Sequence, residues 1–161
     1  MKDSGLLARL ENVYLAEKTS FIRYVVEASQ AELRDDLDRR VFAHYVDWQR
    51  ECARSEEAAR QLLEAEGVIP GEASYPIEFS QFNFLSPTYL LIHVIPKMET
   101  HVRLLEENAA GLGGWPQAQD LVRATAERER LHLEEVRRLE DERPRDPPKP
   151  PRLKGTSASR W

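Results

Sequence analysis

The sequence has one cysteine, seven glycines among 161 residues and no long apolar run. With Cys52 as the single thiol, no disulfide can form within the chain. No stretch approaches the ~18 apolar residues that a membrane-spanning helix needs. The first residues also lack the apolar core and the small-residue cleavage site of a secretory signal. These absences predict a cytoplasmic protein with no membrane partner.

Charge is distributed unevenly along the chain. The net charge is −5, yet the stretch 143–161 has six basic residues against one acidic residue. The preceding part of the chain is therefore more acidic than the total suggests. An acidic surface repels the phosphate backbone, so we expect no nucleic-acid partner. Half of the ten prolines also lie in 143–161, which predicts a Pro-rich, basic and disordered tail after one domain at 1–142.

Apolar residues recur at spacings of three and four along four segments, which is typical of amphipathic helices. Ser29 and Glu32 have the spacing of a capping box at the start of the second segment, and Gly67 follows its end. Pro96 should bend the third helix without ending it. We therefore expect four helices, at about 5–29, 30–66, 87–111 and 116–142.

The predicted helices are joined by two short turns and one long connection. About twenty residues separate the second helix from the third. At ~3.3 Å per extended residue, they can cross a helix of ~25 residues, which is ~37 Å long. The prediction is an all-α four-helix bundle made of two antiparallel helix hairpins, joined by a long crossover between helices 2 and 3. We expect five apolar residues of the crossover to pack along the bundle, namely Tyr75, Ile77, Phe79, Phe82 and Phe84.

Polar residues interrupt the apolar stripes of two helices. Glu17 stands near the centre of the first stripe, and Glu129 and His132 stand in the fourth. A buried carboxylate without a partner costs several kcal/mol, so these positions need a cation or hydrogen-bond donors. A buried network in which His132 donates to the carboxylates would meet this need without a metal. We interpret His44, His93 and His101 as surface or packing histidines.

The combination of Glu17, the sequence "ERLH" at Glu129-x-x-His132 and the long crossover resembles the ferritin-like superfamily, close to rubrerythrin-like and bacterial ferritin-like domains. The resemblance covers residues ~6 to ~140. It implies one or two iron ions held inside a ferritin-like bundle by Glu and Glu-x-x-His ligands from four helices. Carried onto this sequence, it implies Glu17, Glu129 and His132 as metal ligands, with Glu99 of the third helix as a fourth.

The second helix departs from the family pattern. Cys52 and Ser55 occupy the core-facing positions where the family has Glu and His, so the ligand set is incomplete. Cys52 can be read as a small core residue or as a thiolate ligand.

Three hypotheses of function remain open. The first is a non-catalytic bundle with a buried Glu/Glu/His network or weak binding of one metal ion. The second is a di-iron oxidase or peroxidase, or an iron-binding protein, that also uses Glu99 and a Glu51 turned inward. The third is an interaction module, such as a homodimer joined by the crossover aromatics Phe79, Phe82 or Phe84.

Overall fold

The computed structural model of this protein describes residues 2–144. These residues form five α-helices and one 3₁₀ helix, and no strand occurs among them. The predicted all-α class is therefore confirmed, whereas most of the predicted tail lies outside the described residues. The elements are α1 (Ser4–Lys18), α2 (Phe21–Glu27), α3 (Asp36–Ala65), η1 (Ile77–Phe82), α4 (Pro87–Ala110) and α5 (Pro116–Asp141).

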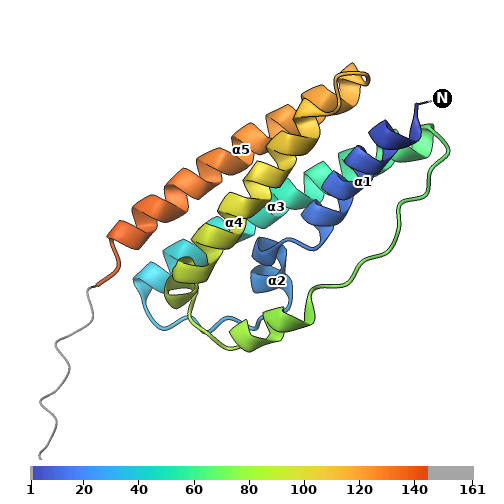
Figure 1. The fold of residues 1–161 in the computed structure, drawn as a ribbon. Coiled ribbons are helices and arrows are strands. Elements are labelled where there is room, and N and C mark those ends of the chain that lie inside the picture. Colours follow the sequence, from blue (N-terminus) through green and yellow to red (C-terminus); the bar gives the residue numbers. More distant parts are fainter. Residues whose placement is uncertain (1, 145–161) are drawn as a thin grey trace, which may run out of the picture.

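The helices are compatible with a four-helix bundle in which α1 and α2 together take one position. α1 runs antiparallel to α3, and α5 runs antiparallel to α4 (Figure 1). The long connection between α3 and α4 returns along the length of the molecule, so these two helices run in the same direction (Figure 1). α1 packs against α3 and α4, and α5 packs against the same two helices.

The first predicted helix, 5–29, is wrong in one respect, because it is divided into α1 and α2. The Thr19 hydroxyl bonds the Leu15 carbonyl at 2.8 Å and ends α1. The Ser20 hydroxyl then accepts the Arg23 N–H and caps α2. Side-chain hydroxyls that bond nearby backbone groups compete with the helical hydrogen bonds. Thr19 and Ser20 follow each other along the chain, and together they interrupt the helix although its apolar stripe is continuous.

The start of the second predicted helix is also wrong, because α3 begins at Asp36 and not near residue 30. Asp35 is the N-cap, and its carboxylate accepts the Asp38 N–H at 2.8 Å. The Ser29 hydroxyl bonds the carbonyl of Val25, at the end of α2, and so caps nothing downstream. The intervening residues pair with the crossover instead, since the Phe84 N–H donates to the Ser29 carbonyl at 2.8 Å.

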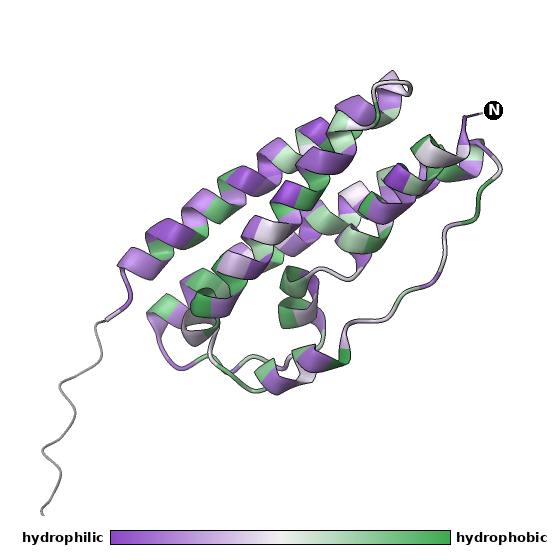
Figure 2. Ribbon diagram, viewed as in Figure 1, coloured by the Kyte–Doolittle hydropathy of each residue, from purple (hydrophilic) through white to green (hydrophobic). Residues whose placement is uncertain are grey.

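The long helices bury the predicted stripes, and each combines hydrophobic and hydrophilic stretches (Figure 2). The buried apolar residues form two clusters. One surrounds Trp48 and Met98, and the other surrounds Leu10 and Leu105. Along the helices, the buried carboxylates Glu17 and Glu129 stand at the junction of the two clusters. The core is therefore apolar at both ends and polar in the middle.

The predictions for the third helix and the crossover are confirmed only in part. α4 begins at Ser86 and Pro87 as N-cap and first residue, and it continues through Pro96, as expected. In the crossover, Phe82 is buried and Tyr75 and Phe79 are partly buried. The expectation that all five apolar residues pack is wrong for Ile77 and Phe84, which are 84% and 62% exposed.

Candidate metal site in the bundle core

Four residues, one from each of the long helices, gather in the middle of the core. Their potential ligand atoms all lie within 4.8 Å of one another. Three of the residues are fully buried, and the side chain of His101 is 9% exposed. Within residues 2–144, no other such group of three or more His, Cys, Asp or Glu residues occurs. The core cluster consists of Glu17 on α1, Cys52 on α3, His101 on α4 and Glu129 on α5.

Hydrogen bonds link the members of the core cluster through one oxygen of each carboxylate. His101 Nε2 lies 2.7 Å from Glu17 Oε1 and 3.5 Å from Glu129 Oε1. The Trp48 indole N–H donates to Glu129 Oε1 at 2.7 Å, and the Cys52 thiol donates to the same oxygen at 3.2 Å. The second oxygen of each carboxylate, Oε2, is buried and has no hydrogen-bond partner among the described residues. Two acceptors in the core thus remain unsatisfied.

The two carboxyl groups of the core cluster differ in charge. Burial and the negative charge of Glu129 raise the pKa of Glu17 well above its ordinary value. Burial alone would also raise the pKa of Glu129, but the charge and hydrogen bond of His101 lower it to about 2. Burial opposes a charge on His101, yet the two carboxyl groups raise its pKa to about 10. Near neutral pH, Glu17 therefore holds a proton and an imidazolium neutralises the Glu129 carboxylate.

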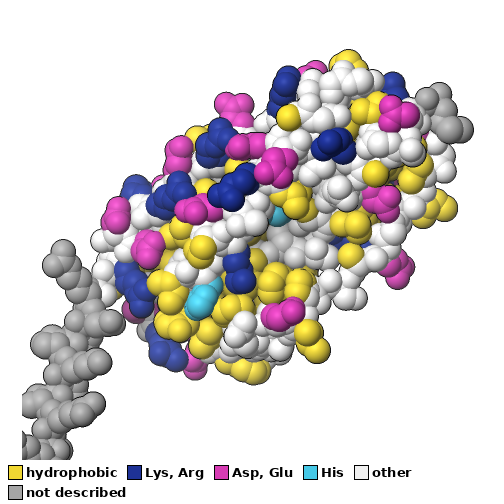
Figure 3. Space-filling model, in the orientation of Figure 1, with side chains coloured by type: hydrophobic (Ala, Val, Ile, Leu, Met, Phe, Trp, Pro, Cys, Tyr) yellow, Lys and Arg dark blue, Asp and Glu magenta, His cyan; other side chains and the backbone are white. Residues whose placement is uncertain are grey.

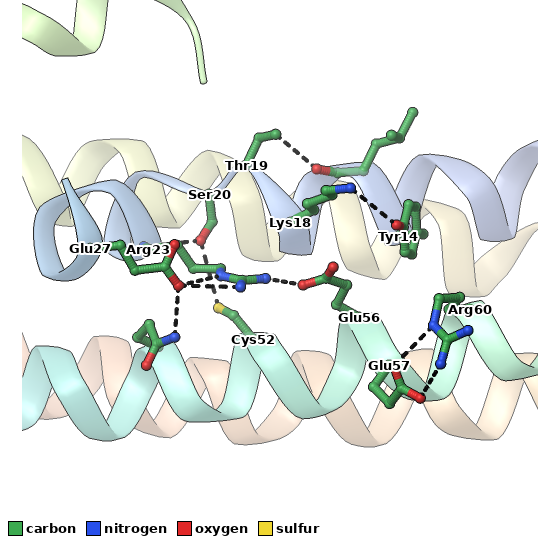
Figure 4. Close-up of polar contacts among 12 residues, drawn as sticks. Tyr14, Lys18, Thr19, Ser20, Arg23, Glu27, Cys52, Glu56, Glu57 and Arg60 are labelled. Atoms are coloured by element: carbon green, nitrogen blue, oxygen red, sulfur yellow. Dashed lines mark hydrogen bonds and ion pairs between the residues drawn. The ribbon is translucent and has the colours of Figure 1, made fainter. Parts of the chain in front are cut away.

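The Cys52 thiol is held in its protonated form. Burial and the charge of Glu129 raise its pKa well above the ordinary value. On its other side, the Ser20 hydroxyl contacts the Cys52 sulfur at 3.7 Å (Figure 4). Ser20 reaches this position because it caps α2 at the break after α1. Nearby, Arg23 of α2 forms an ion pair with Glu56 of α3, which fixes the two helices beside the thiol (Figure 4).

The structure brings together two of the four residues that the sequence suggested as metal ligands. Glu17 and Glu129 meet, whereas His132 and Glu99 lie outside the core cluster. Glu99 is at the surface, in an ion pair with Arg137 at 2.5 Å. His132 is half-buried and points away from the cluster, because the next core position after Glu129 on α5 is taken by Leu133, at a spacing of four.

The histidine of the core cluster is His101, so its interpretation as a surface or packing histidine is wrong. It is three residues after Met98 and four before Leu105, both fully buried, so its spacing places it in the stripe of α4. This signal was present in the sequence. Glu51, the additional ligand of the di-iron hypothesis, does not turn inward, since it pairs with Arg54 and Arg128.

Ser55, the next buried residue of α3 after Cys52, forms a hydrogen bond with a neighbouring side chain. Its hydroxyl bonds the Thr125 hydroxyl at 3.2 Å, and Thr125 in turn bonds the backbone carbonyl of Leu121. Thr125 lies one helical turn before Glu129. On this side of the cluster, two hydroxyl groups stand where a histidine would be needed as a further metal ligand.

A surface pocket reaches one member of the core cluster, His101. Its volume is about 740 Å³, and its lining extends from Thr19 and Phe21, beside the break between α1 and α2, to Phe79 and to His101 on α4. Hydrophobic side chains gather on the corresponding face, over α2, η1 and the first half of α4 (Figure 3). His101 belongs both to the pocket and to the cluster. The other three residues of the cluster are fully buried and do not line the pocket.

The fold and the site together define an all-helical bundle protein with a mixed carboxylate, imidazole and thiol cluster in its core. Comparison of the chain with protein-family models, with curated proteins and with solved structures found no match. Among the described residues, no helix is both long enough and apolar enough to cross a membrane.

Proposed function

We propose that this protein is a ferritin-like bundle that binds one divalent transition-metal ion through Glu17, Cys52, His101 and Glu129. The observation that supports this proposal best is the pair of buried Oε2 atoms without partners in Glu17 and Glu129. A buried acceptor that lacks a hydrogen bond costs ~1–3 kcal/mol. A bound cation would remove this cost at both carboxyl groups.

The types and spacings of the side chains suit a small first-row ion. Carboxylate, imidazole and thiolate are the ligands of four-coordinate Zn²⁺ sites, with metal–ligand distances of ~2.0–2.3 Å. At those distances, tetrahedral ligands lie ~3.2–3.8 Å apart. His101 Nε2 is 2.7 and 3.5 Å from the two carboxylate oxygens, and the Cys52 sulfur is 3.2 Å from one of them. Small side-chain movements would therefore make room for an ion.

Metal binding at this site would release protons. Metal ligands bind in their deprotonated forms. Near neutral pH, Glu17, Cys52 and His101 all hold a proton that the ion must displace, whereas Glu129 is already ionised. The affinity for metal should therefore rise with pH.

Several contacts favour one ion over the two-iron centre of an oxidase or peroxidase. Glu51 and Glu99 are engaged in ion pairs with arginines, and Ser55 is bonded to Thr125. A second ion would need these carboxylates to leave their partners and enter the core. We therefore propose a non-catalytic role in metal binding. The helix pairs α1–α3 and α4–α5, with α3 and α4 in the same direction, support the ferritin-like arrangement (Figure 1).

The proposal can be tested by anaerobic Co²⁺ titration of the full-length protein after metal removal. Tetrahedral Co²⁺ bound to a thiolate has a sulfur-to-metal charge-transfer band, and we expect this band to saturate at one equivalent. Cys52→Ser should abolish the band. Glu129→Gln should weaken binding at least about tenfold, whereas Glu127→Gln, an exposed change on the same helix, should have no effect.

Two results would contradict this proposal. A folded protein without the band would mean that the four side chains form only a hydrogen-bonded network. Two iron ions per chain, both lost in Glu129→Gln, would support the di-iron hypothesis. Circular dichroism of each variant separates loss of ligand from loss of fold.

A further inference from the structure

Beside Trp48, and outside the core cluster, two histidines from different helices face each other. His44 of α3 and His132 of α5 are both half-buried, and their ring centroids are 4.9 Å apart. His44 Nε2 lies 3.2 Å from His132 Nδ1. We propose that this histidine pair is a second metal site, open to solvent, for a divalent ion that prefers imidazole, such as Ni²⁺ or Zn²⁺.

The distance between the two nitrogens fits a shared ion. Imidazole nitrogens bind such ions at ~2.0–2.1 Å, so two neighbouring ligands of one ion lie ~2.9–3.4 Å apart. The observed distance of 3.2 Å falls within this range. Without metal, the His44 N–H can donate to the ring nitrogen or to the backbone carbonyl of His132, which lies 3.3 Å away. An ion would therefore need the tautomer of His44 that has its proton on Nδ1, so that His44 Nε2 and His132 Nδ1 both offer a lone pair.

The charges around the histidine pair favour a cation. Burial lowers the pKa of His44, and burial together with His44 lowers the pKa of His132, so both rings are neutral near pH 7. Neutral imidazole is the form that binds metal. Carboxylates from both helices act on the rings, and one nearby guanidinium opposes them. On α3 these groups are Asp47 and Glu51, and on α5 they are Glu129, Glu135 and Arg138.

The position of Trp48 supplies a built-in reporter for this site. Its ring stacks on His132 with a centroid distance of 5.5 Å and an angle of 15° between the planes. A paramagnetic ion such as Ni²⁺ on the histidine pair would therefore quench the fluorescence of Trp48. The two sites share no ligand, so the second can exist whether or not the first binds metal.

The experiment is a Ni²⁺ titration of the full-length, metal-free protein, followed by tryptophan fluorescence and calorimetry. In Cys52→Ser, where the core cluster lacks one of its ligands, we expect quenching that saturates at one equivalent. His44→Gln should weaken this binding at least about tenfold. The matched control is His93→Gln, because His93 is another half-buried histidine, packed beside Phe82 on the other side of the bundle, and its loss should change nothing.

Cys52→Ser separates the two metal sites. Quenching by Ni²⁺ that persists in Cys52→Ser and disappears when His44→Gln is added to Cys52→Ser supports the second site. Quenching that disappears in Cys52→Ser and persists in His44→Gln would place Ni²⁺ in the core cluster and overturn the inference. A titration with no quenching by Ni²⁺ would overturn it as well.

Discussion

At the scale of single residues, the core cluster shows how two identical side chains acquire different charges. Glu17 and Glu129 are equally buried, and His101 lies between them. Glu129 Oε1 also accepts the Trp48 indole N–H and the Cys52 thiol, and a hydrogen bond with Glu17 helps to lower the pKa of Glu129, whereas Glu17 Oε1 has one such partner, His101. More donors stabilise an anion better, so the proton stays on Glu17.

This asymmetry predicts opposite outcomes for the same substitution in the metal-free protein. Glu17→Gln replaces an acid that is neutral only in the folded protein by an amide that is neutral in both states, so it should raise the free energy of unfolding at pH 7. Glu129→Gln removes the anion beside a buried imidazolium, and it should destabilise the fold by about 3 kcal/mol. Urea denaturation at pH 7 measures both. The reverse order of stabilities would mean that Glu17 carries the charge.

The sequence identified the carboxylates of the core cluster but not its histidine. Glu17 and Glu129 could be found because a charged residue in the middle of an apolar stripe is conspicuous. The choice between His101 and His132 could not be made in this way. A helix has 3.6 residues per turn, so positions three and four away are both compatible with one face. On α5, Leu133 is buried in the core and His132 lies at its edge, whereas on α4 the buried position is occupied by His101.

At the scale of elements, helix ends were harder to predict than helix faces. The stripe of α3 could be read from its apolar spacing, but its first turn depends on Asp35 and Asp38, which the apolar pattern does not include. The break between α1 and α2 has the same origin, since it depends on hydroxyl groups of Thr19 and Ser20. Local side-chain bonds decide where a periodic segment stops being helical.

Asp38 connects the beginnings of two helices, which leads to a prediction of stability. Its carboxylate accepts the backbone N–H of Thr88 at 3.0 Å, in the first turn of α4, and that of Arg34 at 2.9 Å. Asp38→Ala leaves two backbone donors without this partner and should lower the free energy of unfolding by about 2 kcal/mol. Asp36→Ala, in the same turn of α3 but exposed, should change it by less than about 0.5 kcal/mol. Chemical denaturation of both variants provides the comparison, and equal losses would contradict the role of Asp38.

At the scale of the whole molecule, the length of the connections was the most informative feature. The long crossover is present, since the connection between α3 and α4 returns along the molecule and the two helices run in the same direction (Figure 1). The predicted short turn between the first two helices is wrong, because residues 28–35 separate α2 from α3. The packing of individual crossover residues did not follow from length, since Ile77 and Phe84 are exposed. The backbone of Phe84 explains part of this result. It has a φ of +63°, a left-handed conformation that departs from the extended backbone of Asn83 before it.

The charged core also makes the stability of the metal-free molecule depend on pH. The pKa of His101 is about 10 in the folded protein, against an ordinary value of 6.5. The stability that its proton contributes is therefore complete below about pH 6.5 and is lost as pH rises through 10. Glu17 acts in the same direction, because its pKa is also raised. Glu129 acts only in acid, since its contribution is present above pH 4.5 and is lost as pH falls through about 2.

We therefore expect the free energy of unfolding to fall between pH 6.5 and 9.5, by about 1.4 kcal/mol per pH unit for each proton that only the folded state retains. Urea denaturation in the presence of a chelator, at several pH values, measures this slope.

Glu17→Gln should reduce the slope, because it removes one of the two groups. His101→Gln should be less stable than the natural protein at pH 6.5 and should show a smaller slope, because its side chain cannot titrate. A stability that is constant or rises over this range would mean that the imidazole in the core is neutral. The cluster would then hold one proton between its two carboxyl groups and no ion pair.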